Sequence, residues 1–402
     1  MGKIVAVTGN EAVANALRQA DPDVCSLYPI TPQSDIVQRF SSFVSNGKVH
    51  TELLNAESEH SAMSAAIGAA AAGGRVITAT SSQGLALMWE MLHIAAGLSL
   101  PIIMPLVNRA LSAPINIHGD HSDGMGARDT GWVQLWSESA QEAYDNTVMA
   151  FRIGEHMDIR LPVMVCMDGF IVSHSIARME YLEDAEVAAF IGPYKPKNPL
   201  LDMEHPKSFG PLILTDLYHE YKRLQHDIMG RVQKVVLDVS GEFEKLSGRR
   251  YGLFEPYRLE DAEIGLVILN SAAGTSKDVV DEFRDKGIKA GLLKPRLFRP
   301  FPYAEAGQAL KHLKAVCVMD RADSFGGYGP MFMEISSALY QAVQANGRAN
   351  GSCAGPKLIN KIYGLGGRDY MPHDARVVLE ELHEMAKGAP VRTVKEYIGV
   401  RE

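Results

Sequence analysis

The fold is decided by the segment LLNAESEHSAMSAAIGAAAAGGRVITATSSQGLALMWEMLHIAAGLSLPIIMPLV, residues 53–107. Its predicted elements are, in order, a helix over 57–72, a strand over 75–80, a helix over 84–98 and a strand over 101–107. Gly73 and Gly74 indicate the end of the first helix. Ser81 and Ser82 are suited to cap the second. Helices and strands that alternate at this spacing predict a parallel sheet with helices on its faces.

The helix over 57–72 carries almost only small side chains, Ala, Ser and Gly. Two interpretations stay open. Alanine is the best helix former, so the composition can reflect helix propensity alone. Small side chains on every side also let neighbouring backbones approach closely, which suits a helix in the middle of an assembly.

The remainder of the chain predicts a second α/β region. Prolines cluster from about residue 191, and a long charged helix is expected over 217–246, so this part reads as a connector and a bridging helix. From residue 262 strands and helices alternate again. The sequence therefore predicts an α/β protein of two domains in series. The predicted ranges are 1–245 with the connector, then 258–390, then a tail over 391–402.

Composition limits the classes of function. The chain has 402 residues, 46% hydrophobic and 22% charged, which is ordinary for a soluble globular protein. Its formal net charge is −8, and an acidic chain repels phosphate backbones, so no nucleic-acid partner is expected. The apolar stretch 85–107 is interrupted by Glu90 and by Pro101, so we expect a buried helix and strand rather than a membrane span.

The cysteines point to a reducing compartment. The four are Cys25, Cys166, Cys317 and Cys353, and none is near another in the sequence. No C-x-x-C pattern exists, so no iron–sulfur cluster is held by local spacing. Cys25 and Cys166 lie in apolar runs and are expected to be buried reduced thiols. With no signal-peptide core at the N-terminus, a cytoplasmic location is expected.

A first candidate site is YPITPQS at 28–34, where a strand end turns into a helix. Thr31 is a natural N-cap, and Pro32 suits the first helical position. Alternatively, a rigid turn at the carboxyl end of a strand presents the Thr31 hydroxyl to a ligand, because α/β sheets bind ligands at that edge.

A second candidate is ESEH at 57–60. Glu57 and Glu59 can both be first-turn acids that the helix dipole favours, or one of them can be a catalytic carboxylate.

A third candidate is Arg109, which follows a strand and precedes a polar, glycine-containing segment over 116–131. Its guanidinium can hold a carboxylate through two parallel hydrogen bonds, or it can be a solvated surface charge. Four residues nearby superficially resemble metal ligands: His118, Asp120, His121 and Asp123. Their spacing matches no zinc pattern, so no metal site is expected in this chain.

Taken together, these segments resemble the alpha subunits of pyruvate:ferredoxin oxidoreductases. Further motifs extend the likeness: TATSSQG at 78–84, NRALSAPINI at 108–117, GDHSD at 119–123, PVMVCMDGF at 162–170 and, more loosely, LKPRLFRPFP at 293–302 and the loop 320–330. The resemblance implies a thiamine diphosphate pyrimidine-binding type domain followed by a transketolase C-terminal-like domain.

The resemblance also implies roles for particular residues. Glu59 is implied as the carboxyl that hydrogen-bonds the far pyrimidine nitrogen of thiamine diphosphate and promotes its basic imino form. Glu57 is then a structural acid. Arg109 is implied to pair with the carboxylate of a 2-oxoacid, and Thr31 to hydrogen-bond that carboxylate or the 2-oxo oxygen. Pro29 is implied to pack near the cofactor. The implied reaction is the oxidative decarboxylation of pyruvate with coenzyme A to acetyl-CoA, carbon dioxide and reduced ferredoxin.

Two missing motifs imply partner subunits. Related enzymes bind diphosphate and Mg²⁺ through Gly-Asp-Gly, which this sequence lacks, so both are expected on a beta subunit. No cysteine pattern for a cluster is present either, so [4Fe-4S] clusters are expected in partner chains, with gamma- and delta-type subunits, and ferredoxin is expected to dock on another subunit. The chain is therefore expected to act only with its partners.

Three alternatives remain at this stage. The same chemistry can serve another 2-oxoacid, such as 2-oxoisovalerate, 2-oxoglutarate, an aryl-pyruvate or oxalate. The second alternative is a nucleotide-binding dehydrogenase. The motifs GGYG at 326–329 and GLGG at 364–367 support it, although neither completes the G-x-G-x-x-G pattern. A non-catalytic scaffold is the third, and the joint presence of Glu59 and Arg109 argues against it.

Overall fold

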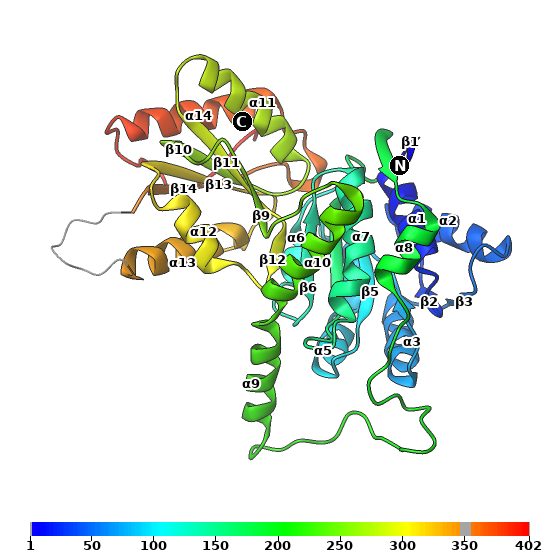
Figure 1. Cartoon of the computed structure of the whole chain (residues 1–402). Coiled ribbons are helices and arrows are strands. Elements are labelled where there is room, and N and C mark those ends of the chain that lie inside the picture. The colour runs from blue at the N-terminus through cyan, green and yellow to red at the C-terminus, as the bar shows by residue number, and fades with distance from the viewer. Residues whose placement is uncertain (1, 346–354, 402) are drawn as a thin grey trace.

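A computed structural model describes residues 2–345 and 355–401 of the chain. Figure 1 shows two α/β units, one from the blue to the green part of the chain and one from the yellow to the red part. The predicted α/β fold class is confirmed. Cys25, Cys166 and Cys317 are buried free thiols, as expected for the first two, while Cys353 lies outside the described residues.

The first unit is built on a seven-stranded sheet of order β12-β6-β7-β5-β4-β2-β3. Six of its strands run parallel: β2 (Val24–Leu27), β3 (Glu52–Asn55), β4 (Val76–Ile77), β5 (Ile102–Asn108), β6 (Val133–Ser137) and β7 (Val163–Asp168). The seventh, β12 (Leu297–Arg299), comes from the predicted second domain and pairs antiparallel with β6. The expected N-terminal strand β1 (Lys3–Val7) pairs with β8 (Ala177–Tyr181) in a separate two-stranded sheet.

Helices cover both faces of this sheet. They are α1 (Gly9–Ala20), α2 (Ser34–Ser45), α3 (Glu59–Ala72), α4 (Ser82–Leu87), α5 (Trp89–Gly97), α6 (Ser122–Gly126), α7 (Ala140–Gly154) and α8 (Asp184–Ile191). Successive side chains of a strand point to opposite faces, so Ile103 and Val107 of β5 join a core with α1 and α7. Met104 and Leu106 join the other core, with α3 and α5.

The central segment differs from its prediction in two places. The strand expected over 75–80 ends at Ile77, and the helix expected over 84–98 is divided at Met88 into α4 and α5. Ser81 is the N-cap residue of α4, but its hydroxyl donates to the carbonyl of Val107 instead of capping the helix. The small-residue helix α3 buries Ala62, Met63 and Ala66 and exposes Gly68, so its place in an assembly stays a prediction.

The predicted bridging helix is two helices, α9 (Tyr218–Met229) and α10 (Val232–Ser247), with Gly230 between them. Glycine is a poor helix former, which explains the break. Helix α10 packs on the first core through an apolar face that includes Val235 and Val239. By contrast α9 buries no residue and projects from the body together with the segment before it (Figure 1). None of the helices among the described residues is long and apolar enough to cross a membrane.

The second unit has a six-stranded sheet of order β15-β14-β13-β10-β11-β9. Its strands are β9 (Phe254–Tyr257), β10 (Ile264–Ile268), β11 (Ala290–Pro295), β13 (Ala315–Asp320), β14 (Lys357–Ile362) and β15 (Lys395–Tyr397). Its helices are α11 (Ala272–Asp285) and α14 (Pro372–Ala386) on one face and α12 (Tyr303–Leu310) and α13 (Pro330–Ala345) on the other. The face with α12 and α13 shares a core with the first unit.

A buried polar network joins the two units at the carboxyl end of β7. Asp168 accepts a hydrogen bond from His121 Nε2 at 2.7 Å and from the backbone N–H of Ser271 at 3.0 Å, and Arg321 Nη1 lies 3.5 Å away. Burial by itself would raise the pKa of Asp168. The charges of His121 and Arg321 and the hydrogen bonds outweigh this effect and hold the pKa well below its usual value. Because Ser271 and Arg321 belong to the second unit, the carboxylate of Asp168 links the two units.

Replacement of Asp168 by Asn is expected to destabilise the chain by about 3 kcal/mol near neutral pH, because a buried positive charge loses its partner. A carboxylate with a lowered native pKa stabilises the fold above its unfolded pKa, near 3.8, and this contribution is lost as the pH falls. Urea unfolding of both proteins, from neutral pH to about pH 3, should show the difference in unfolding free energy shrinking below about pH 4. A difference that stays constant would contradict an ionised Asp168.

Candidate functional site

The candidate site lies where four neighbouring strands end. In the order β5-β4-β2-β3 these strands are parallel, so their carboxyl ends share one edge of the sheet. Arg109 follows β5, Gly84 follows β4, Thr31 follows β2 and Glu59 follows β3. Ligands bind α/β sheets at this edge. The three residues predicted to be catalytic thus all follow strand ends at one edge of the sheet.

Glu59 is the first residue of α3, whose N-cap is Ser58. The residue is 7% exposed, and no hydrogen bond or ion pair joins its side chain to another of the described residues. A buried carboxyl normally has partners, so this one is suited to receive a group from outside the chain. Glu57 lies before the N-cap, exposed, and accepts from Ser61 Oγ at 2.5 Å. Its predicted place in the first turn is wrong, because the helix begins only at Glu59, after the N-cap Ser58.

Gly84 provides the space that the Glu59 carboxyl occupies. A Cβ added at Gly84 would lie 2.8 Å from Glu59 Oε1 and would also overlap the Thr80 hydroxyl. Any larger residue would therefore move the carboxyl of Glu59. Gly84 is not among the site residues predicted from the sequence. The signal available for it was its place at the end of the TATSSQG motif.

Arg109 is held from three sides. Its backbone N–H donates to Asp123 at 2.9 Å, Nε donates to the carbonyl of Asn116 at 2.9 Å, and Nη1 donates to the carbonyl of Thr31 at 2.8 Å. The structure thus brings Arg109 and Thr31 into contact. Burial lowers the pKa of Arg109, and the Asp123 carboxylate partly opposes this. The outer N–H groups of Nη1 and Nη2 still form a fork that suits a carboxylate.

Thr31 is not the cap of α2, so that prediction is wrong. The N–H of Gln33 donates to the carbonyl of Ile30 at 2.9 Å and closes a turn over 30–33. Because of this turn, the helix begins only at Ser34, with Gln33 as its N-cap. Thr31 is exposed, and no hydrogen bond joins its hydroxyl to another described residue.

The same turn is fastened to the body of the first unit. Gln33 Nε2 donates to the carbonyl of Ala79 at 3.1 Å, and Asn10 Nδ2 donates to the carbonyl of Pro32 at 2.9 Å. Both amides are fully buried. Pro29 lies exposed at the start of the turn. The Thr31 hydroxyl is therefore presented from a rigid support.

Asp123 fixes the backbone beneath the site. Its buried carboxylate accepts from the N–H groups of Ser82 and Arg109 at 2.9 Å each, of Gly124 at 2.7 Å, and from Asn108 Nδ2 at 2.9 Å. Desolvation raises its pKa to about 7 in spite of these donors. Because every partner donates, this carboxylate ties the loop after β4 to the loop after β5.

The residues that superficially resembled metal ligands serve separate contacts. His118 faces Asn116, Asp120 accepts from Ser122, His121 pairs with Asp168 and Asp123 binds the backbone. Within 2–345 and 355–401, no three His, Cys, Asp or Glu side chains are grouped to hold a metal ion.

The glycines at 326–329 do not form a phosphate site. They lead into α13, whose first amides, Met331 N–H at 2.8 Å and Phe332 N–H at 3.2 Å, donate to Asp320. A carboxylate thus occupies the helix terminus where a nucleotide phosphate would bind. The dehydrogenase alternative is not favoured.

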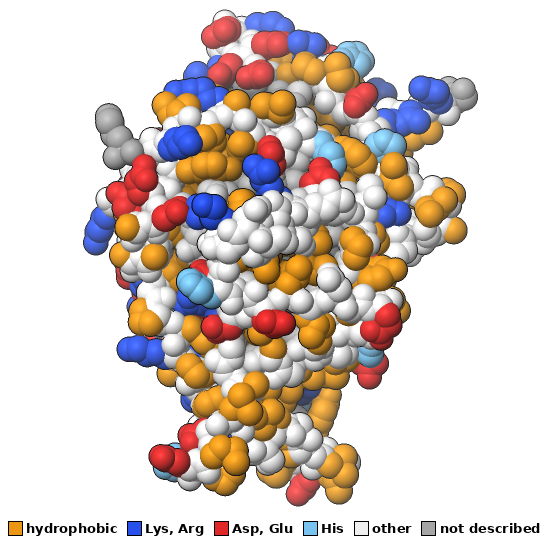
Figure 2. Space-filling model, turned by 90° about the vertical axis from the view of Figure 1, so that its right-hand side faces the viewer, with side chains coloured by type: hydrophobic (Ala, Val, Ile, Leu, Met, Phe, Trp, Pro, Cys, Tyr) orange, Lys and Arg blue, Asp and Glu red, His pale blue; other side chains and the backbone are white. Residues whose placement is uncertain are grey.

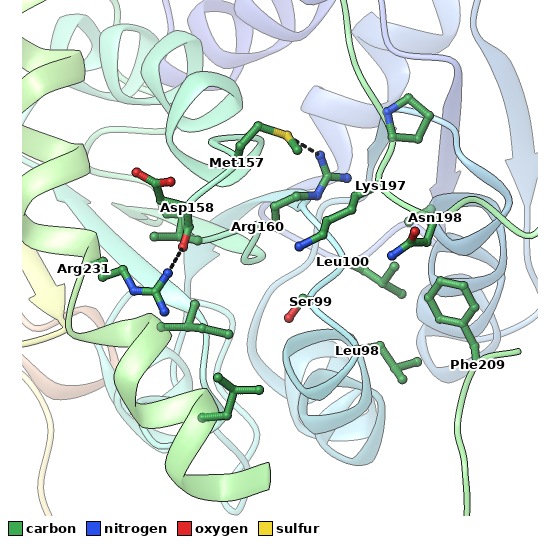
Figure 3. A pocket seen from close by; sticks show the side chains of 15 residues that line it. Leu98, Ser99, Leu100, Met157, Asp158, Arg160, Lys197, Asn198, Phe209 and Arg231 are labelled. Carbon is green, nitrogen blue, oxygen red and sulfur yellow. Dashed lines mark hydrogen bonds between the residues drawn. The ribbon is translucent and has the colours of Figure 1, made fainter. Parts of the chain in front are cut away.

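A separate cavity of about 380 Å³ opens at the opposite edge of the first sheet (Figure 3). Its lining includes 98–100, before β5, and 157–160, before β7, and Arg231 of the connector donates to the carbonyl of Asp158. None of the predicted site residues lines it.

Comparison with known proteins agrees with this geometry. Residues 15–240 match the family described as "Pyruvate flavodoxin/ferredoxin oxidoreductase, thiamine diP-bdg", and residues 262–375 match "Pyruvate:ferredoxin oxidoreductase core domain II". "Pyruvate synthase subunit PorA" of Thermotoga maritima is 52% identical over 99% of this chain and 98% of its own length. The protein of the same name from Methanocaldococcus jannaschii is 42% identical over 96% of each chain.

Solved structures share the fold. A 2-oxoglutarate:ferredoxin oxidoreductase from Magnetococcus marinus has a TM-score of 0.68 at 20% identity, over 96% of this chain and 66% of that one. A split-gene transketolase has a TM-score of 0.55 at 12% identity, over 95% of this chain and 100% of that one. The resemblance predicted from the motifs is confirmed: this chain belongs to the pyruvate flavodoxin/ferredoxin oxidoreductase family and carries its thiamine diphosphate-binding domain.

Proposed function

We propose that this chain is the alpha subunit of a pyruvate:ferredoxin oxidoreductase and supplies one half of its thiamine diphosphate site. The observation that carries the proposal is the carboxyl of Glu59, a largely buried residue whose side chain has no partner among the described residues, on the same sheet edge as Arg109 and Thr31. The proposed reaction converts pyruvate and coenzyme A to acetyl-CoA and carbon dioxide, with electrons passed to ferredoxin.

The residues at this edge fit the pyrimidine end of thiamine diphosphate. When bound, this cofactor supplies the carbanion chemistry that decarboxylation of a 2-oxoacid requires. Glu59 would hold a hydrogen bond to the far pyrimidine nitrogen, since the residue is 7% exposed and its carboxyl has no other partner among the described residues. Gly84 leaves room for that carboxyl, and Pro29 would pack near the cofactor. Water is largely excluded from Glu59, which strengthens such a bond.

Arg109 and Thr31 would bind the 2-oxoacid. The Arg109 fork would take the substrate carboxylate, while the carbonyls of Thr31 and Asn116 hold the guanidinium in place. The Thr31 hydroxyl would donate to the carboxylate or to the 2-oxo oxygen. Both side chains come from supported backbone, so they would orient the substrate as well as bind it.

A beta subunit would complete the site. The sequence has no Gly-Asp-Gly, so the diphosphate and Mg²⁺ would be held by that partner. Apolar side chains are exposed on the elements that carry the site: Leu87 at 51%, Trp89 at 44% and Ile115 at 80%. Exposed apolar surface of this kind is typical of protein interfaces.

Further subunits would carry the [4Fe-4S] clusters, with gamma- and delta-type chains, and ferredoxin would dock there. The connector offers additional apolar surface for such contacts, with Leu201 72%, Met203 86% and Leu212 89% exposed. Figure 2 shows hydrophobic side chains at the lower end of the molecule, where α9 and the segment before it project. Buried free thiols suit a reducing cytoplasm as the location.

Pyruvate is the substrate that the relatives favour. The 52% identical relative is named a pyruvate synthase subunit, whereas a ketoisovalerate oxidoreductase subunit of Pyrococcus abyssi is 40% identical over 94% of this chain. For the complex co-expressed with its partner subunits, we expect kcat/KM to be roughly tenfold higher with pyruvate than with 2-oxoisovalerate, 2-oxoglutarate or oxalate. Coenzyme A-dependent reduction of a low-potential dye measures this. A higher value for another 2-oxoacid would reassign the substrate.

Glu59→Gln is expected to lower kcat of the complex by about 100-fold or more, because an amide cannot supply the proton that the pyrimidine nitrogen needs. Glu57→Gln is the matched control, two residues away and exposed, and should stay within about twofold of the wild type. Equal rates for the two variants in the dye assay would refute the role of Glu59.

Arg109→Lys is expected to raise KM for pyruvate by about tenfold or more, since an ammonium cannot replace the planar fork. Arg128→Lys, in the polar segment that follows Arg109 and bound to the carbonyl of Met125, serves as the control and should change KM by less than about twofold. Steady-state kinetics at saturating coenzyme A separates the two. An unchanged KM in Arg109→Lys would remove Arg109 from the substrate site.

A further inference from the structure

The glycine turn at 364–367 of the second unit lies directly against the loop that follows β5. Asn116 Nδ2 donates to the carbonyl of Gly366 at 2.9 Å. In the opposite direction, the N–H of Gly366 donates to Asp120 Oδ2 at 3.0 Å. Two hydrogen bonds of opposite direction thus join this one glycine to the loop.

The same loop holds Arg109. The backbone carbonyl of Asn116 accepts from Arg109 Nε at 2.9 Å, while its side chain reaches Gly366. Ala110, next to Arg109, donates its N–H to the carbonyl of His118 at 3.0 Å. Asn116 therefore connects the Arg109 guanidinium to the second unit, through its backbone carbonyl on one side and its side chain on the other.

Only glycine permits this approach. Gly366 has φ +61° and Gly367 has φ +82°, in the left-handed region. A Cβ added at Gly366 would overlap Asn116 Nδ2, and one added at Gly367 would overlap His118. The turn is itself anchored, because Arg321 Nε donates to the carbonyl of Gly364 at 3.1 Å.

We propose that the turn at 364–367 positions the 2-oxoacid by holding Arg109 through Asn116. The inference rests on the proposed role of Arg109 in binding the substrate carboxylate. Neither Gly366 nor Asn116 would touch the reacting atoms, so both are positioning residues. A displacement of about 1 Å in a group that orients the substrate can strongly lower the rate of reaction. The second unit would therefore contribute to the substrate site without lining it.

Gly366→Ala tests this, with Gly326→Ala as the matched control. Gly326 also has a positive φ, +84°, but nothing lies within 4 Å of its added Cβ. Both variants thus place alanine in a left-handed turn of the second unit, and only one displaces Asn116. In the assembled complex we expect Gly366→Ala to raise KM for pyruvate about tenfold, with kcat within about twofold. Gly326→Ala should leave both constants at wild-type values.

Asn116→Ala provides a second route in case Gly366→Ala does not fold. It removes the side-chain hydrogen bonds to Gly366 and to the N–H of His118 and leaves the backbone carbonyl that Arg109 uses. KM should therefore rise with little change in kcat. The double variant Gly366→Ala with Asn116→Ala relieves the overlap, and its KM should fall below the product of the single effects. A wild-type KM in Asn116→Ala would overturn the proposal.

The outcome also separates this inference from the proposed function. If Arg109→Lys leaves KM unchanged, the substrate role of Arg109 fails and the positioning role fails with it. If Arg109→Lys raises KM while Gly366→Ala and Asn116→Ala do not, only the positioning role fails. A fall in kcat equal to the rise in KM for Gly366→Ala, matched by a loss of thermal stability beyond that of Gly326→Ala, would show general damage and would likewise overturn it.

Discussion

The parallel pairing of β5, β4, β2 and β3 is the constraint on which the site depends. Parallel strands place all their carboxyl ends on one edge, so the loops after them converge although they are far apart in the sequence. Glu59 and Gly84, in the first turns of α3 and α4, and Arg109, in the loop after β5, all lie at that edge. Helix α3 adds burial, because its small side chains pack closely and carry the Glu59 carboxyl into the sheet edge.

Buried polar groups fix the loops at that edge. Asp123 receives four N–H donors and joins the loops after β4 and β5. Asp168 joins the first unit to Ser271 and Arg321 of the second. Buried carboxylates that accept several hydrogen bonds hold the backbone around them in place. In the proposed enzyme, the first unit would bind the cofactor and substrate, and the second would keep the substrate loop in place.

Features decided by local chemistry could be predicted from the sequence, and features decided by distant contacts could not. The end of α3 was predictable because Gly73 adopts the left-handed conformation that closes helices. Thr31 looked suited to cap α2, yet that helix begins at Ser34 with Gln33 as its N-cap, and the Gln33 side chain bonds to the carbonyl of Ala79, just after β4. The Ser81 hydroxyl likewise does not cap its helix, because it donates to the carbonyl of Val107.

By itself the sequence determined the family, the α/β class and the candidate residues Glu59, Arg109 and Thr31, because motifs and short-range periodicity are properties of neighbouring residues. The fold, not the local pattern, buries Glu59 without a partner among the described residues and leaves Glu57 exposed. It also decided that Asn116 meets Gly366, 250 residues away. Contacts at such separation depend on how sheets and loops pack after the chain has closed on itself, and no local pattern encodes them.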